Sequence, residues 1–201
     1  MLIRSHDDGS GDKERWRAFV DSQGFGHLVA AGADRAVPVV VPTQFVLRGD
    51  TVVLHLAKSN PIFACLADND QVVLSVAGDW AYIPGAWKAV GDEDPRVGVP
   101  TTYYAAVQLT GTATVFAEPE ATAAVLREQL AALEPDGDYI DPVEHGSKLP
   151  TIRGLSIAVT EVRAKFKYGG NVDEAHRAHI AAQLAARGGP GDAAAHRQME
   201  P

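Results

Sequence analysis

Short apolar, β-branched stretches alternate with polar turns along most of the chain, a pattern typical of antiparallel strands. We expect strands at residues 24–32, 36–47, 51–57, 71–78, 101–117 and 152–168. The Arg-Gly-Asp sequence between the second and third stretches predicts a turn, and therefore a hairpin. Pro38 and Pro42 indicate an edge position or bulges for the second strand, because proline has no N–H to donate across a sheet.

Helix signals separate some of these strands and follow the last one. We expect helices at residues 13–22, 60–69, 119–133 and 171–187. Asn60 is a suitable N-cap for the second helix, and Asn171 for the last. The apolar face of the third helix is expected at Val125, Leu126, Leu130 and Leu133. Together, the expected strands and helices predict an α+β protein, mainly β, built as a small antiparallel barrel with flanking helices.

Length and composition limit the class of protein to which the chain can belong. The 201 residues, 46% of them apolar, can bury a substantial core, so we expect a single domain over residues 1–188. Residues 189–201 are rich in Gly and Ala and predict a flexible tail. The only cysteine, Cys65, lies among apolar helix residues and is expected in the core. One cysteine, no signal peptide and no membrane-length apolar run favour a cytoplasmic protein.

The charge balance limits the partners of the chain. It has 18 Lys and Arg residues against 26 Asp and Glu residues, which gives a net charge of −8. A large nucleic-acid footprint needs a concentrated basic surface, so we do not expect direct DNA binding. A local basic pocket is compatible with this balance.

The segment HLAKSNPIF, residues 55–63, joins a strand to a helix and has the composition of an anion site. Backbone N–H groups at a helix start have no intrahelical partner and favour an anion. Lys58 adds a full positive charge, while Ser59 and Asn60 add side-chain donors. His55 faces away from the apolar side of its strand and can point into the same space. The alternative is an ordinary capped helix with a solvated lysine.

Two further segments carry candidate binding residues. The loop AYIPGAWK contains Tyr82 and Trp87, which can stack on a flat ligand, close an interface or plug one end of a barrel. At the end of the last strand, RAKFKY places Arg163, Lys165 and Lys167 on one face. This face is either a local positive patch or a solvated outer surface.

Signatures of other catalytic sites are weak. His176 and His179 have the i, i+3 spacing of two metal ligands on a helix, but no cysteine or carboxylate cluster completes the set, so no metal is expected. The chain has no G-x-S-x-G, P-loop or dinucleotide-binding glycine motif. The sequence therefore assigns no catalytic residue.

Four segments, in order, make the chain resemble the PaiB-type family of FMN-binding negative transcriptional regulators. They are HLAKSNPIF, GDWAYIPGAWK, VPTTYYAAVQLTG and IRGLSIAVTEVRAKFKYGGN. The similarity covers roughly residues 1–188. It implies an FMN-binding split β-barrel, antiparallel and Greek-key-like, related to pyridoxamine-phosphate-oxidase-like flavoproteins. It also implies a homodimer with the flavin between the subunits.

The resemblance further implies which residues contact the cofactor. In this fold the flavin phosphate is held at a strand end and the helix that follows, which here carry His55, Lys58, Ser59 and Asn60. Other implied contacts, to the flavin or the partner subunit, are Thr43, Tyr82, Trp87, Pro100, Thr101, Lys165 and Lys167. Apart from Thr43, these positions match the family's aromatic loop, its V-P-T motif and its A-K-F-K run.

The chain departs from the family pattern in loops expected around the flavin ring. It has YIPGAWK where family members often read Y-I-S-P-S-W-Y, VPTTYY in place of V-P-T-W-N-Y, and KYGGN in place of K-L-S-Q-N. Val40 stands where a histidine is frequent. These differences concern recognition of the ring and of any substrate rather than the barrel.

We expect an FMN-binding homodimer of regulatory type that acts indirectly or through a partner. The alternative is a small FMN-dependent oxidoreductase or flavin reductase, for which His55, Tyr82 and Tyr103 are the nearby candidates for proton transfer. A third possibility is a barrel that binds haem or a deazaflavin. Lys58 and the helix start suit a phosphate better than a porphyrin, so this possibility ranks last.

Overall fold

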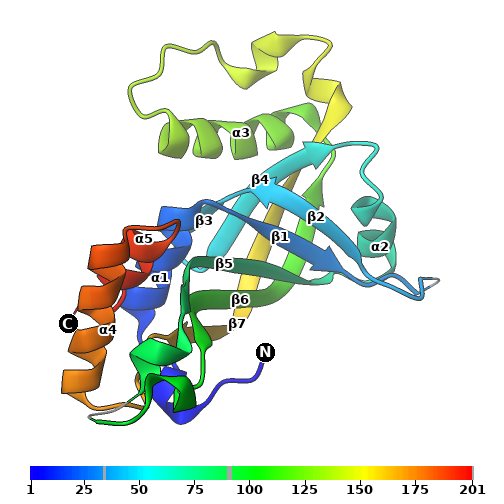
Figure 1. The fold of residues 1–201 in the computed structure, drawn as a ribbon. Helices are drawn as coiled ribbons and strands as arrows, with labels where there is room; N and C mark the ends of the chain where they lie inside the picture. Colours follow the sequence, from blue (N-terminus) through cyan, green and yellow to red (C-terminus); the bar gives the residue numbers. More distant parts are fainter. Residues whose placement is uncertain (34, 90–91, 201) are drawn as a thin grey trace. The chain divides into compact units, whose positions relative to one another are not determined.

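Seven β-strands form one sheet in the computed structural model, which describes residues 1–33, 35–89 and 92–200 (Figure 1). The strands are β1 (Phe25–Ala30), β2 (Val39–Gln44), β3 (Val46–Arg48), β4 (Thr51–Ala57), β5 (Gln71–Ile83), β6 (Thr101–Phe116) and β7 (Ile152–Lys167). Their order across the sheet is β2-β1-β5-β6-β7-β4-β3. β1 pairs antiparallel with β2 and β5, and β4 pairs antiparallel with β3 and β7.

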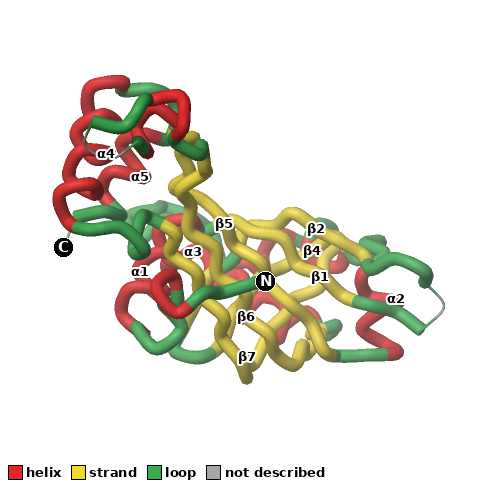
Figure 2. Tube along the Cα trace, turned by 60° about the horizontal axis from the view of Figure 1, so that its bottom comes forward, coloured by secondary structure: helices red, strands yellow, loops and turns green. Residues whose placement is uncertain are grey.

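Helices flank the sheet. The α-helices of the described residues are α1 (Lys13–Gln23), α2 (Ile62–Asp68), α3 (Pro119–Leu133), α4 (Glu174–Arg187) and α5 (Asp192–Arg197). Short 3-10 helices are η1 (Ser5–Asp7), η2 (Gly85–Lys88), η3 (Pro95–Val97), η4 (Pro142–His145) and η5 (Leu149–Thr151). Figure 2 shows α4 and α5 side by side. None of the helices in the described part of the chain has the length and apolar character to cross a membrane.

The contacts within the chain divide it into two compact units. The first unit comprises residues 1–16, 77–107 and 163–200, and the second comprises residues 17–76 and 108–162. β5, β6 and β7 are long strands that pass from one unit to the other. The short strands β1 to β4 belong to the second unit alone.

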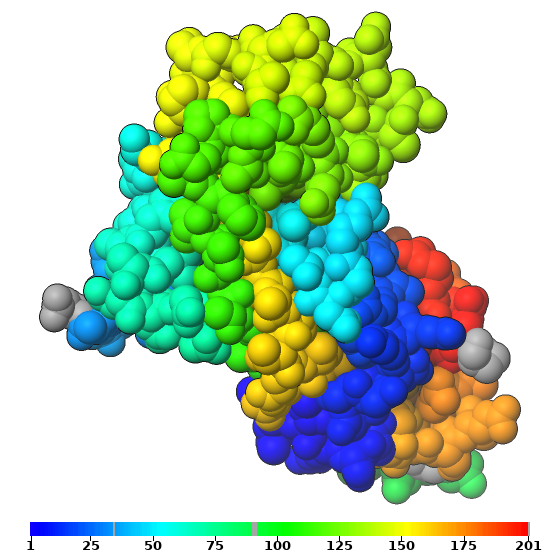
Figure 3. Space-filling model, turned by 180° about the vertical axis from the view of Figure 1, so that it is seen from behind, coloured from blue at the N-terminus to red at the C-terminus, as the bar shows by residue number. Residues whose placement is uncertain are grey.

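The second unit has an aliphatic core. The fully buried leucines come from several strands and are Leu28, Leu54, Leu74, Leu109 and Leu155. Figure 3 shows part of β7 (yellow) between β6 (green) and β4 (cyan), in agreement with the order of the sheet. On α3, Val125 packs in a cluster with Val46 and Val53. Cys65 is buried, which confirms its predicted core position.

The buried face of α3 agrees in part with the expected one. Its buried residues are Thr122, Ala123, Val125 and Gln129, whereas Leu133 is 43% exposed. The helix faces β4, where His55 offers a polar partner to Gln129, and the Thr122 hydroxyl donates to the carbonyl of Phe116 at 3.1 Å. Val125 is buried as predicted and Leu126 and Leu130 are half-buried, so the predicted face is wrong only at Leu133, while the polar residues Thr122 and Gln129 complete the buried face.

The second predicted strand is two strands in the structure. β2 ends at Gln44 and β3 begins at Val46, with buried Phe45 between them. The N–H of Phe45 donates to the carbonyl of Gly24 at 3.1 Å. β3 forms the predicted hairpin with β4, but β2 pairs with β1, so the expectation of one hairpin strand is wrong over β2. β2 does lie at the sheet edge, as Pro42 predicts.

In the first unit, buried polar contacts tie the strands to the C-terminal residues. The rings of Tyr103 and Tyr168 meet edge to face, with centroids 6.0 Å apart. The hydroxyl of Tyr168 donates to the carbonyl of Asp79 at 2.7 Å, and the side-chain amide of Gln198 donates to the Asp79 carboxylate at 2.8 Å. Asp79 therefore connects β5 with β7 and with the C-terminal segment.

The cap of α4 is Asp173, so the expected Asn171 cap is wrong. The Asp173 carboxylate accepts from the N–H of His176 at 2.8 Å. The preceding turn begins at Gly169 and extends to Val172, whose N–H donates to the Gly169 carbonyl at 3.2 Å, which moves the helix start along the chain. Gly188, at φ 58°, follows the helix end as predicted.

Residues 189–200, for which the sequence predicts a flexible tail, include helix α5. Asp192 and Ala195 are buried, at 1% and 0% exposure. The carbonyl of Met199 accepts from the guanidinium of Arg177 at 2.8 Å. The buried side chains of this segment are thus a small apolar residue, Ala195, and an ion-paired acid, Asp192. Prediction of a helix from sequence depends on regularly spaced long apolar side chains instead.

Candidate functional site

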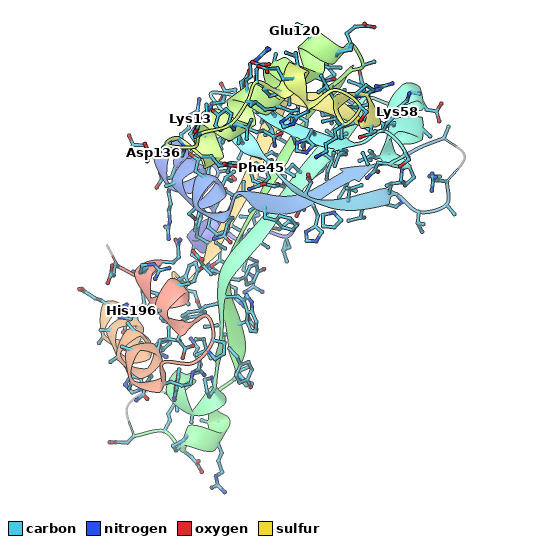
Figure 4. All side chains as sticks on the ribbon, turned by 90° about the horizontal axis from the view of Figure 1, so that it is seen from above. Lys13, Phe45, Lys58, Glu120, Asp136 and His196 are labelled. Carbon is cyan, nitrogen blue, oxygen red and sulfur yellow. The ribbon has the colours of Figure 1, made fainter. Side chains whose placement is uncertain are left out.

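The junction of β4 and α2 contains the expected anion-binding segment, where Figure 4 labels Lys58. The backbone N–H of Lys58 donates to the carbonyl of Thr151 at 2.8 Å. The N–H of Asn60 closes a turn onto the carbonyl of Ala57 at 2.8 Å. The side-chain oxygen of Asn60 accepts from the N–H of Ile62 at 3.1 Å, so Asn60 caps the helix start.

A cavity of about 600 Å³ has Lys58 in its lining, and we call it the Lys58 cavity. It is lined by Lys58, Phe63, Leu66, Ala67, Ala113, Thr114, Val115 and Arg153. Most of these residues are apolar, and Lys58 and Arg153 are the charged ones. A largely apolar lining with a few polar groups, at this volume, is typical of small-molecule sites.

Arg153 is a candidate ligand residue that sequence reasoning missed. It lies at the start of β7, opposite Leu56 of β4, so strand pairing brings it close to Lys58 despite their separation in the chain. Its Nη1 donates to the carbonyl of Ala117 at 3.3 Å, which fixes the side chain toward the end of β6. The sequence carries no local signal for this pairing, since it depends on the register of two distant strands.

Three other residues expected to contact the cofactor lie outside the lining of the Lys58 cavity. The Nδ1 atom of His55 lies 2.7 Å from the side-chain oxygen of Gln129 on α3, so one ring nitrogen already has a partner. Ser59 is exposed on the turn. Thr43 is buried, and its hydroxyl donates to the carbonyl of Gln44 at 3.0 Å. The lining of the Lys58 cavity includes none of these three residues.

The first unit has a cavity of its own, of about 390 Å³, which we call the basic cavity. It brings together four of the expected residues, Pro100, Thr101, Lys165 and Lys167. The other lining residues are Leu2, Arg4, His6, Asp7, Lys88, Val99, Tyr103 and Asn171. The face of β7 that carries the lysines is therefore part of a cavity, and Lys165 is only 8% exposed, so it is not a solvated outer surface.

The two lysines of β7 have different partners in this cavity. Lys165 donates to the carbonyl of Leu2 at 3.0 Å, and its Nζ lies 3.9 Å from the carboxylate of Asp7. Lys167 donates to the hydroxyl of Thr101 at 2.6 Å. Both ammonium groups lie near the ring of Tyr104, at 5.5 and 5.9 Å from its centroid.

Tyr82 and Trp87 of the aromatic loop lie outside the linings of these two cavities, whereas Lys88 of the same loop lines the basic cavity. Tyr82 is 51% exposed, and its carbonyl accepts from the guanidinium of Arg187 at 2.9 Å. The same guanidinium lies 4.6 Å from the ring centroid of Trp87. One face of Trp87 is thus used by Arg187, while the Tyr82 side chain is available to a ligand or a partner.

The histidine pair of α4 borders another cavity. His176 and His179 both line a space of about 420 Å³ in the first unit. Within the described ranges, no three His, Cys, Asp or Glu side chains are grouped so as to hold a metal ion. The structure therefore supplies no ligand set around this pair.

Comparison with protein families and characterised proteins gives two matches. Residues 1–161 match the family model FMN_bind_2, described as "Putative FMN-binding domain". The protease synthase and sporulation protein PAI 2 of Bacillus subtilis (strain 168) is 26% identical over 192 residues, which cover 92% of this chain and 89% of that protein.

Solved structures share the fold. The flavocytochrome Anf3 from Azotobacter vinelandii matches with a TM-score of 0.59 at 22% identity, over 83% of this chain and 73% of that one. The FAD- and haem-binding protein from Mycobacterium smegmatis matches with a TM-score of 0.60 at 18% identity, over 88% and 78%. The predicted class, a mainly antiparallel split β-barrel with flanking helices, is confirmed.

Proposed function

The chain belongs to the PaiB-type family of FMN-binding domains, and from that premise we propose that it binds FMN in the Lys58 cavity. The observation that carries the proposal is the pairing of two cations with an apolar lining in one space of about 600 Å³. Lys58 and Arg153 would hold the phosphate. The apolar residues suit the flavin ring.

The lining fits both halves of this cofactor. Phe63 and Leu66 on α2 and Val115 on β6 provide apolar surface for a flat ring. An arginine can bind two phosphate oxygens at once, and a lysine contributes a compact positive charge. Bound FMN supplies electron-transfer chemistry, while this chain binds and orients it and excludes water.

We place the homodimer on the outer face of β1 and β2. Phe25 and Val40 are 55% and 53% exposed, and both point to the same side of the sheet as Val29 and Pro42. Apolar residues on an exposed sheet face at the sheet edge are typical of an interface. A second copy of this chain would cover them, as the resemblance implies.

We propose a regulatory role for the chain, and its charge argues against direct contact with DNA. The similar protein from Bacillus subtilis is named a protease synthase and sporulation protein, and the proposal of a regulatory function for this chain rests on the family resemblance. The net charge of this chain, −8, disfavours binding to duplex DNA, so regulation would operate through a protein or small-molecule partner. Tight binding of the purified protein to duplex DNA, weakening steeply with salt, would overturn this part of the proposal.

The phosphate contacts can be tested by comparing FMN with riboflavin, which lacks the phosphate. We expect wild-type protein to bind FMN at least about tenfold more tightly, since charge-assisted contacts contribute about 1.5–3 kcal/mol. The double variant K58M/R153M should lose most of this preference, while K148M, which removes an exposed lysine, should keep it. Equal affinity of wild-type protein for both flavins would contradict the assignment.

A further inference from the structure

The basic cavity concentrates positive charge in an acidic protein. Four of its lining residues, Arg4, Lys88, Lys165 and Lys167, are cationic, and Asp7 is the acidic one. The chain as a whole carries a net charge of −8. The cavity shares no lining residue with the Lys58 cavity, and each lies within its own unit. The basic cavity is therefore a separate candidate binding site for an anionic ligand.

Three of these cations, Arg4, Lys88 and Lys167, form no ion pair with a carboxylate in the described part of the chain. The Asp7 carboxylate lies near Lys165, and Lys167 donates to the neutral hydroxyl of Thr101. No described carboxylate forms an ion pair with Lys88 or Lys167. Burial, and then the charge of Lys167, lower the pKa of the Lys88 ammonium. Like charges held together in this way are stabilised when an anion binds between them.

A buried hydroxyl in the same lining also lacks a partner. Tyr103 is 2% exposed, and its hydroxyl makes no hydrogen bond to any described residue. Burial raises the pKa of Tyr103 to about 12, so the group is an O–H donor at neutral pH. An unsatisfied buried donor costs about 1–3 kcal/mol, and buried polar groups in folded proteins are nearly always paired. An acceptor atom of a ligand would satisfy it.

We propose that the basic cavity binds a phosphate group, free or as a phosphate monoester, separately from the phosphate of the flavin. Lys88 and Lys167 would match the two charges of a phosphate dianion, and the hydroxyl of Tyr103 would donate to one of its oxygens. A carboxylate has a single charge and two oxygens, so it would use fewer of these donors. Thr101, Lys165 and Lys167, expected from the family resemblance as flavin or partner contacts, serve this second ligand instead.

The test is a calorimetric titration of the FMN-loaded protein with inorganic phosphate. We expect saturable binding of one phosphate per chain. The double variant K88M/K167M should bind at least about tenfold more weakly, because it removes two charge-assisted contacts. Y103F should bind roughly threefold to tenfold more weakly, because it removes one neutral donor. The control K148M should bind like wild type, and circular dichroism with thermal melting confirms that each variant is folded.

Absorbance of the retained flavin is recorded for each sample, so that failure of the two proposals can be told apart. Retained FMN with no phosphate binding would overturn the second site and leave the flavin proposal intact. If phosphate binds only to flavin-free protein, and K88M/K167M releases FMN, the basic cavity holds the flavin phosphate itself and the separate site is refuted. If wild type retains no FMN, the same titration of flavin-free wild type and K88M/K167M still decides the phosphate site. Titration with a sugar phosphate distinguishes a monoester ligand from free phosphate.

Discussion

At the scale of single residues, one buried acid holds the C-terminal segment together. Asp192 is 1% exposed, and its carboxylate accepts from the guanidinium of Arg187 at 2.7 and 2.5 Å. It also accepts from the N–H of Gly189 at 2.8 Å. The hydrogen bonds from Arg187 lower the pKa of Asp192 below its ordinary value of 3.8. The charged pair of Arg187 and Asp192 thus links the end of α4 to the start of α5.

Substitution D192N tests this pair. It should lower the free energy of unfolding at pH 7 by about 2 kcal/mol, since Arg187 loses a charged partner but is itself partly exposed. Because the folded pKa is depressed, the carboxylate stabilises the fold above pH 3.8, and this contribution is lost as the pH falls through the folded pKa. In urea unfolding, the difference between wild type and D192N should therefore shrink below pH 3.8. A constant difference, or an equal effect of the exposed control D138N, contradicts the account.

Also at the residue scale, the sequence reveals the charged residues of a site more readily than the residues that they contact in the fold. Lys58, Lys165 and Lys167 stand out by residue type, and the structure places each of them in a cavity lining. Arg153 does not stand out, because its role depends on strands that meet only in the fold, and Tyr103 is expected from the sequence as a proton-transfer candidate rather than as a donor in a cavity lining. A residue that acts through a distant partner has no local signature in one sequence.

At the scale of elements, a glycine shows how closely two strands approach. β6 continues without interruption through Gly111. A Cβ atom at Gly111 would lie 2.3 Å from the carbonyl oxygen of Ala158 on β7. The glycine is therefore required by the contact between the backbones of β6 and β7.

Substitution G111A should force these strands apart. We expect it to lower the free energy of unfolding by about 2–3 kcal/mol, because a backbone oxygen cannot move aside as a flexible side chain can. The matched control is G11A, where an added Cβ would meet no atom within 4 Å. Chemical denaturation of both variants decides the matter, and equal stabilities would refute the close approach.

Element boundaries follow the strength of the sequence signals. β4 and α3 have the predicted limits, since the turn before β4 and Pro119 at the start of α3 are clear signals. β5 continues five residues beyond its predicted end, through Asp79, whose φ of 49° is unusual for a residue other than glycine. Helix α5 is stabilised by an ion pair and by small residues, and neither gives the regular spacing of apolar residues from which a helix is predicted.

At the scale of the whole molecule, the fold class is predictable and the arrangement of sites is not. The predicted strands, their turns and the family resemblance all indicate a split barrel, and the similarity to known structures agrees. The division into two units, each with its own cavity, arises because β5, β6 and β7 are long enough to serve both. The predicted lengths of β6 and β7 are right to within one residue, whereas β5 is five residues longer than predicted.

The proposed homodimer gives a prediction at this scale. Substitution V40D adds a charge to the apolar face of β1 and β2, where its desolvation would oppose association. We expect wild type to sediment as a dimer at micromolar concentration and V40D as a monomer. V143D, at a position 41% exposed on η4, is the control and should be dimeric. A monomeric wild type, or a dimeric V40D, would refute this interface.

The most direct test of the central claim is the visible absorbance of the purified protein after FMN is added and the excess removed. We predict a bound flavin spectrum at one FMN per chain, reduced strongly in K58M/R153M and unchanged in K148M, with all three proteins folded. Wild-type protein that retains no flavin would contradict FMN binding. Retention unchanged in K58M/R153M would contradict the Lys58 cavity as its site.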